Sequence, residues 1–260
     1  MFARFTHAIV RPPARNFADG LTTVRIGVPD VAVALAQHAA YCAALERNGC
    51  TVVALPADSR YPDSTFVEDT ALILPGQGAV LTLPGADSRA GEVDAIRDAV
   101  CQFFPNAPQI VAPATLDAGD VCEAGTHMFI GISHRTNAEG ARQLTAWLAT
   151  HGVTASTVDI RDTPGILHLK SGVVAIDETQ VVAIRALATH DEFRNYHVLC
   201  VPDGEEYAAN MVRVNDVVFA AHGFPRTHAM LRALGYSLEI LDMSEYARMD
   251  GGLSCLSLRF

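Results

Sequence analysis

The feature that most constrains the fold is a structural unit that recurs along the chain. Each copy begins with a polar residue of a chemically reactive type and continues as two short apolar strands joined by a turn. The leading residues are Asp69, Asp120, His168, Asn210 and Cys255. Their period of roughly 40–50 residues predicts a radial repeat, in which similar α/β units surround one axis.

Hydrophobic spacing and turn residues define the expected elements of the first four units. The first has strands over 69–74 and 79–83, a turn at 75–78 and a helix over 91–104. The second has strands over 121–123 and 127–132 and a helix over 137–151. The third starts at His168, with a turn at 177–179 and a strand over 180–184. The fourth starts near Asn210, with a turn at 215–216, a strand over 217–221 and a helix over 226–234.

The fifth unit is expected to join the two ends of the chain. Residues 254–260 are predicted to pair with residues 5–10, and the helix of this unit would span 31–48. A doubly wound parallel sheet is the alternative, because strands and helices also alternate there. No GxGxxG or P-loop supports that alternative. In the radial arrangement the leading residues would converge at one end of the axis.

Bulk composition excludes several functional classes. The 260 residues are half hydrophobic, enough for one large domain or two small ones. The net charge of −10 argues against nucleic acid or an anionic membrane as the main partner. No stretch approaches the roughly 18 apolar residues of a membrane span, and residues 1–7 lack the apolar core of a signal peptide. We therefore expect a cytoplasmic protein, whose six cysteines without CxxC pairs are free thiols.

Six segments in this order resemble the dimethylarginine dimethylaminohydrolase family of the guanidine-modifying superfamily: 18–22, 61–69, 116–120, 133–137, 167–172 and 250–255. Each segment is short, but their order and spacing are specific, and the resemblance extends from Phe5 to Phe260. It implies a five-bladed ββαβ propeller of the pentein type, with pseudo-fivefold symmetry, forming a single catalytic domain over residues 1–260. It also implies hydrolysis of Nω-methylated arginines, asymmetric dimethylarginine and monomethylarginine, to L-citrulline and dimethylamine or methylamine.

The resemblance identifies Cys255 as the nucleophile. A guanidinium is a poor electrophile, and a thiolate is strong enough to attack its central carbon and form a covalent thiouronium. A free thiol, with a pKa of about 8.5, is mostly protonated at neutral pH, and a bound cation would favour the thiolate. Gly251 and Gly252 allow the backbone to approach a ligand closely. Without the resemblance, Cys255 would read as a buried cysteine of a terminal strand.

The resemblance also identifies the general acid and base and the group that orients it. His168 would protonate the departing amine and then deprotonate the attacking water, because imidazole titrates in the range that both steps need. Asp117 matches the family position of a carboxylate that fixes the imidazole tautomer. Asp120 competes for that role, and either carboxylate alone would read as a turn residue that caps its own backbone.

The family positions that bind substrate fall into three groups. Asp63, Glu68 and Asp69 match a cradle for the guanidinium, whose N–H donors suit carboxylates; alone they would read as a solvated acidic turn. A second group, matching the residues that hold the substrate's α-carboxylate by bidentate pairing, consists of Arg89 and Arg135. The third group lines the substrate pocket. Leu21 matches the lid over it, and the other lining positions are matched by Leu167, Met249 and Ser254.

We expect no cofactor and no metal, since HExxH and paired Cys/His spacings are missing from the sequence. Zinc bound by Cys255 and His168 would inhibit, a hypothesis that unchanged activity with added zinc or a chelator would contradict. The expected partner is a small guanidino substrate, and the protein would be a monomer or homodimer. Rival functions on the same fold are arginine deiminase, agmatine deiminase, amidinotransferase, a non-catalytic binding factor and an inactive sensor. Methylarginine catabolism and control of nitric oxide synthase inhibitors both fit the expected reaction.

Overall fold

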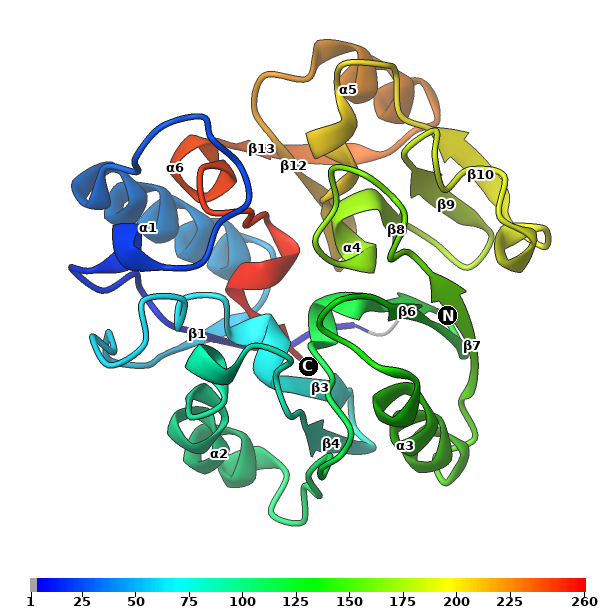
Figure 1. The fold of residues 1–260 in the computed structure, drawn as a ribbon. Helices are drawn as coiled ribbons and strands as arrows, with labels where there is room; N and C mark the ends of the chain where they lie inside the picture. The colour runs from blue at the N-terminus through cyan, green and yellow to red at the C-terminus, as the bar shows by residue number, and fades with distance from the viewer. Residues whose placement is uncertain (1–3) are drawn as a thin grey trace.

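Five small β-sheets surround a common axis in the computed structural model, which describes residues 4–260 (Figure 1). Met1, Phe2 and Ala3 lie outside the described residues. These residues begin the N-terminal segment that was not expected to be a signal peptide. Each sheet corresponds to one predicted unit, and we call it a blade and number it as that unit. The five-bladed propeller predicted from the repeat and the resemblance is therefore confirmed.

The blades share one strand order. A first strand pairs antiparallel with a second, which pairs in parallel with a third. The strands are β3 (Ala71–Leu74) and β4 (Gly78–Leu81) in blade 1, β5 (Val121–Ala124), β6 (His127–Ile132) and β7 (Thr154–Asp159) in blade 2, β8 (Val173–Ala175), β9 (Gln180–Ala183) and β10 (His197–Cys200) in blade 3, and β11 (Val212–Val214), β12 (Val217–Ala221) and β13 (Ser237–Leu241) in blade 4. In blade 1 the third strand is represented by a parallel bridge from Leu81 to Gln109.

The two ends of the chain build blade 5 together. Its strands are β14 (Leu258–Arg259), β1 (His7–Val10) and β2 (Thr51–Ala54). β14 is antiparallel to β1, with Ala8 opposite Arg259, and Figure 1 shows the red end of the chain beside the blue strand β1. The predicted pairing of the ends is therefore confirmed. It fixes Cys255, three residues before β14, against the first part of the chain.

Four longer helices cover the outside of the ring (Figure 1). They are α1 (Val31–Arg47), α2 (Glu92–Phe103), α3 (Ala138–Ala149) and α5 (Pro225–Ala233), each close to its predicted range. Local sequence explains where they begin: Asp30 accepts hydrogen bonds from two N–H groups of the first turn of α1, Asn137 caps α3, and Pro225 opens α5. The short helices α4 (Leu169–Gly172) and α6 (Ser244–Ala247) lie nearer the axis.

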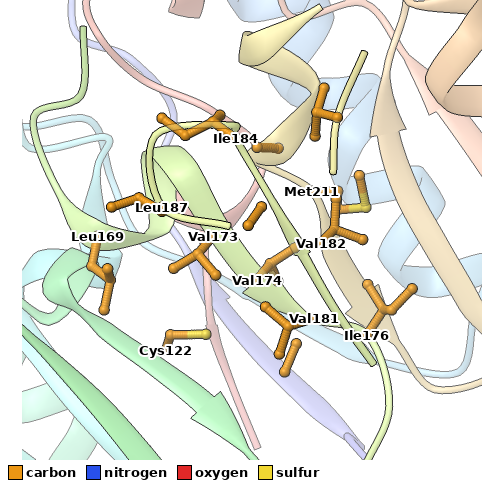
Figure 2. Packing of buried hydrophobic residues seen from close by; sticks show 14 of the residues in the cluster. Cys122, Leu169, Val173, Val174, Ile176, Val181, Val182, Ile184, Leu187 and Met211 are labelled. Carbon is orange, nitrogen blue, oxygen red and sulfur yellow. The ribbon is translucent and has the colours of Figure 1, made fainter. Parts of the chain in front are cut away.

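The hydrophobic core lies between neighbouring blades. Figure 2 shows one cluster, in which the valines of β8 and β9 pack between Cys122 of β5 and Met211 beside β11. The first strands are therefore covered on both faces: all four residues of β3 and all three of β8 are buried. Such strands read as continuous apolar runs. None of the described helices is long and apolar enough to cross a membrane.

Two details differ from the sequence analysis. The leading residues were expected at strand starts, but they lie on or beside single helical turns that precede the strands, such as Val67–Thr70, Ala118–Asp120 and Ser254–Leu256. These are 3-10 turns, in which consecutive side chains lie about 120° apart, so neighbouring residues face different regions. The third strands were also not predicted as elements, because their residues are largely half-exposed and lack an apolar run.

Candidate active site

One small cavity at the axis brings together most of the predicted site residues. Its wall contains Leu21, Asp63, Phe66, Asp69, Arg89, Arg135, Leu167, His168, Met249, Asp250, Gly251 and Cys255. The proposed nucleophile and general acid therefore share one cavity, although 87 positions separate them in the sequence. Among the predicted residues, Asp117, Glu68 and Ser254 lie behind this wall rather than in it.

Single helical turns present the reactive groups. Cys255 is the middle residue of the 3-10 turn Ser254–Leu256, and His168 caps the N-terminus of α4. Asp117 directly precedes the turn Ala118–Asp120 of blade 2. Because each blade contributes its turn at the same level of the propeller, groups from four blades meet at one end of the axis.

His168 is held by Asp117. The imidazole Nε2 lies 2.9 Å from Oδ2 of Asp117, whose Oδ1 accepts the backbone N–H of Gly85 at 2.8 Å. Asp120, the alternative partner, instead accepts the N–H of Leu169 at 2.9 Å and the hydroxyl of Ser133 at 2.6 Å. The geometry therefore favours Asp117 over Asp120 as the group in contact with the ring.

The protonation of His168 follows from this carboxylate environment. Burial alone lowers its pKa, but Asp69, the hydrogen bond to Asp117 and the charge of Asp120 together raise the pKa to about 9. The pKa of Asp117 is lowered: burial raises it, but the contact with His168 and the charge of Arg89 outweigh burial. At neutral pH the ring is an imidazolium that can donate a proton.

Cys255 is in the opposite state. Burial raises the pKa of its thiol to about 12, and the carboxylates of Glu68 and Asp69 add to that effect. The N–H of Gly252 and the ammonium of Lys170 act in the other direction and favour the thiolate. At neutral pH the sulfur therefore keeps its proton.

Two carboxylates of the predicted cradle reach the cavity. Asp63 accepts the backbone N–H of Leu21 on both oxygens at 3.1 Å, and burial raises its pKa against the opposing charge of Arg89. Asp69 accepts the N–H of Gly119 at 2.9 Å and the guanidinium of Arg89 at 2.6 Å. Both carboxylates are buried and available to a flat cation.

Glu68 faces away from this cavity. Its Oε1 accepts a hydrogen bond from Lys170 at 2.7 Å and from Arg259 at 3.2 Å, and it lines a separate cavity with these two residues. The neighbouring Asp69 points to the other side of the same helical turn. Direct contact between Glu68 and a substrate would require the side chain to turn.

The two predicted arginines differ in their present partners. Arg89 is buried and donates to Asp69, Glu92 and the carbonyl of Phe66, which occupies four of its five N–H groups. Nη1 of Arg135 is buried without a hydrogen-bond partner among residues 4–260. A buried guanidinium nitrogen with a free donor is suited to receive an anion such as a carboxylate.

Three buried groups lie close enough to share a cation. Ligand atoms of Asp69, Asp117 and His168 are within 4.8 Å of one another. These atoms already satisfy one another and the N–H groups of Gly119 and Arg89. The raised pKa of His168 also means that a metal would have to displace a proton from the ring. Zinc binding by Cys255 and His168 stays a prediction.

A loop covers the cavity, and we call residues 20–27 the strap. Thr22 donates to the carbonyl of Arg248 at 3.0 Å, and both the N–H and the hydroxyl of Thr23 donate to the carboxylate of Asp250. Arg248 in turn donates to the carbonyl of Ile26 at 2.7 Å. Beneath the strap the cavity holds about 20 Å³ of free space, less than a methylated arginine occupies, so we expect the strap or the wall to move when substrate binds.

Some cavity residues were not predicted as binding residues. Phe66 packs against Gly251, where an added Cβ would lie 2.3 Å from the ring, and Asp250 joins the strap to the segment before Cys255. Both positions fall inside the segments that carry the family resemblance, so the motif was visible but the role of each residue was not. A larger cavity of about 750 Å³ adjoins the site and shares Leu167, Asp250 and Gly251 with it.

Comparison with known proteins identifies close relatives, although no family model matches the sequence. The N(G),N(G)-dimethylarginine dimethylaminohydrolase of Pseudomonas aeruginosa is 44% identical over 257 residues, covering 98% of this chain and 100% of the relative. A crystal structure of that bacterium's enzyme, a cysteine-to-serine variant with citrulline, has a TM-score of 0.95 at 43% identity and covers 99% and 100% of the two chains. A histidine-to-glycine variant of such an enzyme, as an adduct with S-methyl-L-thiocitrulline, has a TM-score of 0.94 at 43% identity and covers 98% and 100%.

Proposed function

The chain belongs to the dimethylarginine dimethylaminohydrolase family, and from this premise we propose that it hydrolyses Nω-methylated arginines to L-citrulline and an alkylamine. The observation that carries the proposal is the cavity shared by Cys255, His168 and the carboxylates of Asp63 and Asp69. A thiol, an imidazolium and two acids around one small space suit the covalent hydrolysis of a flat cation.

The first half of the reaction is substitution at the guanidinium carbon. The bound cation offsets the negative field of Asp69 and so favours loss of the Cys255 proton to solvent water, because His168 already carries its proton. The thiolate attacks the central carbon and forms a tetrahedral adduct. His168 then protonates the methylated nitrogen, the C–N bond breaks, and dimethylamine or methylamine leaves. The enzyme retains a thiouronium in which sulfur is bound to the former guanidinium carbon.

The second half of the reaction restores the enzyme. His168, now neutral, removes a proton from a water molecule that attacks the thiouronium carbon. The C–S bond then breaks and the sulfur leaves as thiolate. The added oxygen loses its second proton to solvent as the carbonyl of L-citrulline forms, and the thiolate takes a proton back from solvent once the cation is gone. The sum is substrate and water to citrulline and amine, so no redox cofactor is needed. Asp117 supports the imidazolium in both halves through its contact at 2.9 Å.

The substrate-binding roles belong to the same proposal. Asp63 and Asp69 would hold the guanidinium, and Arg135 would receive the α-carboxylate with its unpartnered Nη1. We assign Arg89 a supporting role in the same interaction, because this buried cation lines the cavity. Leu21, Leu167, Met249 and, through its backbone, Ser254 would complete the pocket. Glu68 would act through the field it exerts on Cys255 unless it turns.

Domain organisation and cellular context are also proposals. We infer a single catalytic domain over residues 1–260, which the closure of blade 5 by both chain ends supports. We infer a small guanidino substrate as the partner and a monomer or homodimer as the assembly. A reducing compartment, such as the cytoplasm, suits an enzyme that needs a free thiol, and the six cysteines are unpaired.

The proposed function is tested by comparing substrates at steady state. Citrulline formation is measured with asymmetric dimethylarginine, monomethylarginine, arginine and agmatine, and the methylated substrates should give the highest kcat/KM. Faster turnover of arginine or agmatine would instead identify a deiminase. In Cys255→Ser the activity should fall at least 10³-fold while substrate still binds. Intact mass of a rapidly quenched reaction should reveal the thiouronium adduct on the wild-type chain.

A further inference from the structure

One kind of hydrogen bond recurs between neighbouring blades. Oδ1 of Asp69 in blade 1 accepts the backbone N–H of Gly119 in blade 2 at 2.9 Å. Oδ1 of Asp120 in blade 2 accepts the N–H of Leu169 in blade 3 at 2.9 Å. Oδ1 of Asn210 in blade 4 accepts the N–H of Ser254 in blade 5 at 3.2 Å. The residue that leads one repeat thus holds the helical turn of the next.

Two of the three held N–H groups lie next to catalytic residues. Leu169 follows His168 and Ser254 precedes Cys255. We propose that Asp120 and Asn210 are positioning residues, Asp120 for the imidazole of His168 and Asn210 for the sulfur of Cys255. The inference rests on the proposed function for its kinetic consequences, but the contacts themselves do not depend on it.

Asn210 shapes the turn that carries the nucleophile, and it also lines the larger cavity beside the site. Its amide packs so closely on Gly252 that an added Cβ there would lie 2.3 Å from Cγ of Asn210. Tyr207, three residues earlier, donates its hydroxyl to the carbonyl of Gly251 at 2.8 Å. The backbone before Cys255 is therefore held at both ends by one segment of blade 4. That backbone includes the N–H of Gly252, which favours the thiolate of Cys255.

Asp120 is built into blade 2 in the same way. It is fully buried, and the hydroxyl of Ser133 donates to its Oδ2 at 2.6 Å, which fixes the orientation of the carboxylate. Gly131 leaves it just enough room, since an added Cβ there would lie 2.8 Å from Oδ1. Asp120 thus reaches His168 through the backbone of Leu169, whereas Asp117 bonds to the ring itself.

A purely structural role makes a different prediction from a positioning role. Bonds that only join the blades would change the melting temperature and leave the chemistry of the folded enzyme intact. Positioning bonds also affect rate, because an error of about 1 Å in a reacting group can cost on the order of 10²-fold. The chain uses both Asp and Asn for this contact, so exchanging one for the other should preserve it.

The first arm of the test measures how fast the thiol of Cys255 reacts, which does not depend on turnover. Iodoacetamide alkylation of Cys255 is followed by mass spectrometry on the tryptic peptide 249–259, in which Cys255 is the single cysteine. Asn210→Ala should slow alkylation at least fivefold, and Asn210→Asp should stay within threefold of wild type. Asn48→Ala is the matched control: its amide binds the carbonyl of Ala44 at the end of α1, so it should lower the melting temperature alone.

The second arm measures turnover of asymmetric dimethylarginine. Asn210→Ala and Asp120→Ala should each lower kcat about tenfold or more, with KM within threefold of wild type. Asp120→Asn keeps the acceptor oxygen but removes a charge that helps to raise the pKa of His168. It should recover kcat at neutral pH to within threefold, while the alkaline limb of the pH profile moves to lower pH. Alkylation of Cys255 in Asp120→Ala should stay within twofold of wild type, because this variant acts on the imidazole.

Unchanged alkylation and unchanged kcat in the alanine variants, with a lower melting temperature, would overturn the proposal. Should an alanine variant fail to fold, Tyr207→Phe and Ser133→Ala each remove one oxygen from the same two arrangements. These variants should slow alkylation or turnover, respectively, at least threefold, and wild-type values in both would equally reject positioning. A wild-type protein that hydrolyses no methylated arginine would refute the proposed function alone, since the alkylation arm still decides for Asn210.

Discussion

At the scale of single residues, the cavity holds a neutral thiol and a charged imidazole. The pKa of Cys255 is raised to about 12, first by burial and then by nearby carboxylates. The pKa of His168 is raised to about 9, because the surrounding acids outweigh the effect of burial. This pair is therefore not a preformed thiolate–imidazolium couple at neutral pH. A cationic substrate in contact with the sulfur would favour the thiolate.

We accordingly expect the thiolate of Cys255 to form in the free enzyme only well above pH 8.5, the usual pKa of a free cysteine. Thiolate absorbance near 240 nm can be titrated as the difference between wild type and Cys255→Ser, which removes the signal of the other five cysteines. A saturating guanidino ligand that is not turned over should move the midpoint to lower pH. A midpoint near 8.5 without ligand would contradict this assignment of charge.

Asp117 should control the alkaline limit of activity. A histidine whose folded-state pKa is raised keeps its proton up to that pKa, so the general acid is lost as pH rises through about 9. Asp117→Asn removes one of the carboxylates that raise this value, and the alkaline limb of kcat/KM should move to lower pH. We expect kcat to fall about 10- to 100-fold. An unshifted limb would show that Asp117 does not govern the charge of the ring.

The sequence predicted which residue types meet at the site but not which way each side chain points. The spacing of Cys255, His168 and Asp69 placed them at equivalent points of the repeat, and they share a cavity. Glu68 was assigned to the same cradle because it adjoins Asp69 in the motif. The 3-10 turn that holds both residues separates adjacent side chains by about 120°, and no feature of the sequence indicates which of the two faces the cavity.

At the scale of elements, hydrogen bonds connect the strap to the segment before Cys255. Asp250 has a positive φ of 57° and accepts hydrogen bonds from the backbone and side chain of Thr23. It lies immediately before Gly251 and Gly252, which lead to the nucleophile. A movement of the strap would therefore also move the backbone that positions the sulfur of Cys255.

Weakening the hydrogen bonds between Thr23 and Asp250 should loosen the strap and open the cavity. Asp250→Asn keeps a residue that tolerates positive φ but removes the charge that receives the two donors of Thr23. We expect KM for asymmetric dimethylarginine to rise about threefold or more, and alkylation of Cys255 in the free enzyme to accelerate. Thr150→Val, which removes a hydroxyl bonded to Trp147 at the end of α3, is the control. If KM and the alkylation rate were the same in Asp250→Asn and wild type, the bonds between Thr23 and Asp250 would not hold the strap closed over the cavity.

The elements themselves were predictable where burial is two-sided. Strands such as β3 and β6 appear in the sequence as apolar runs because neighbouring blades cover them. The third strands, for example β2 and β7, alternate between exposed and half-buried residues and gave no comparable signal. Tertiary pairing with the middle strand, and not local hydrophobicity, makes them strands.

At the scale of the whole molecule, strand pairing closes the ring of blades, and charged side chains pack along its axis. Period and end pairing were visible in the sequence, since they depend on local patterns repeated five times. The charged filling was not, because it joins residues from separate blades: Lys170 and Arg259 both bind Glu68. Arg259 also donates to the carbonyl of Ser254, which begins the turn that carries Cys255, and to the carbonyl of Ser257, which follows that turn.

Removing one member of this axial cluster should destabilise the entire ring. Lys170, the single lysine of the chain, is buried and lies 2.7 Å from Glu68. Lys170→Met leaves a buried carboxylate short of a counter-charge, so we expect the free energy of unfolding in urea to fall by about 3–5 kcal/mol. Lys170→Met with Glu68→Gln should recover part of that loss, because the unpaired charge is gone. The control is Arg185→Met, which breaks a pair with Asp203 whose side chains are 72% and 70% exposed and should cost less than about 1 kcal/mol. If Lys170→Met cost no more than this surface control, the axial charges would contribute nothing to holding the blades together.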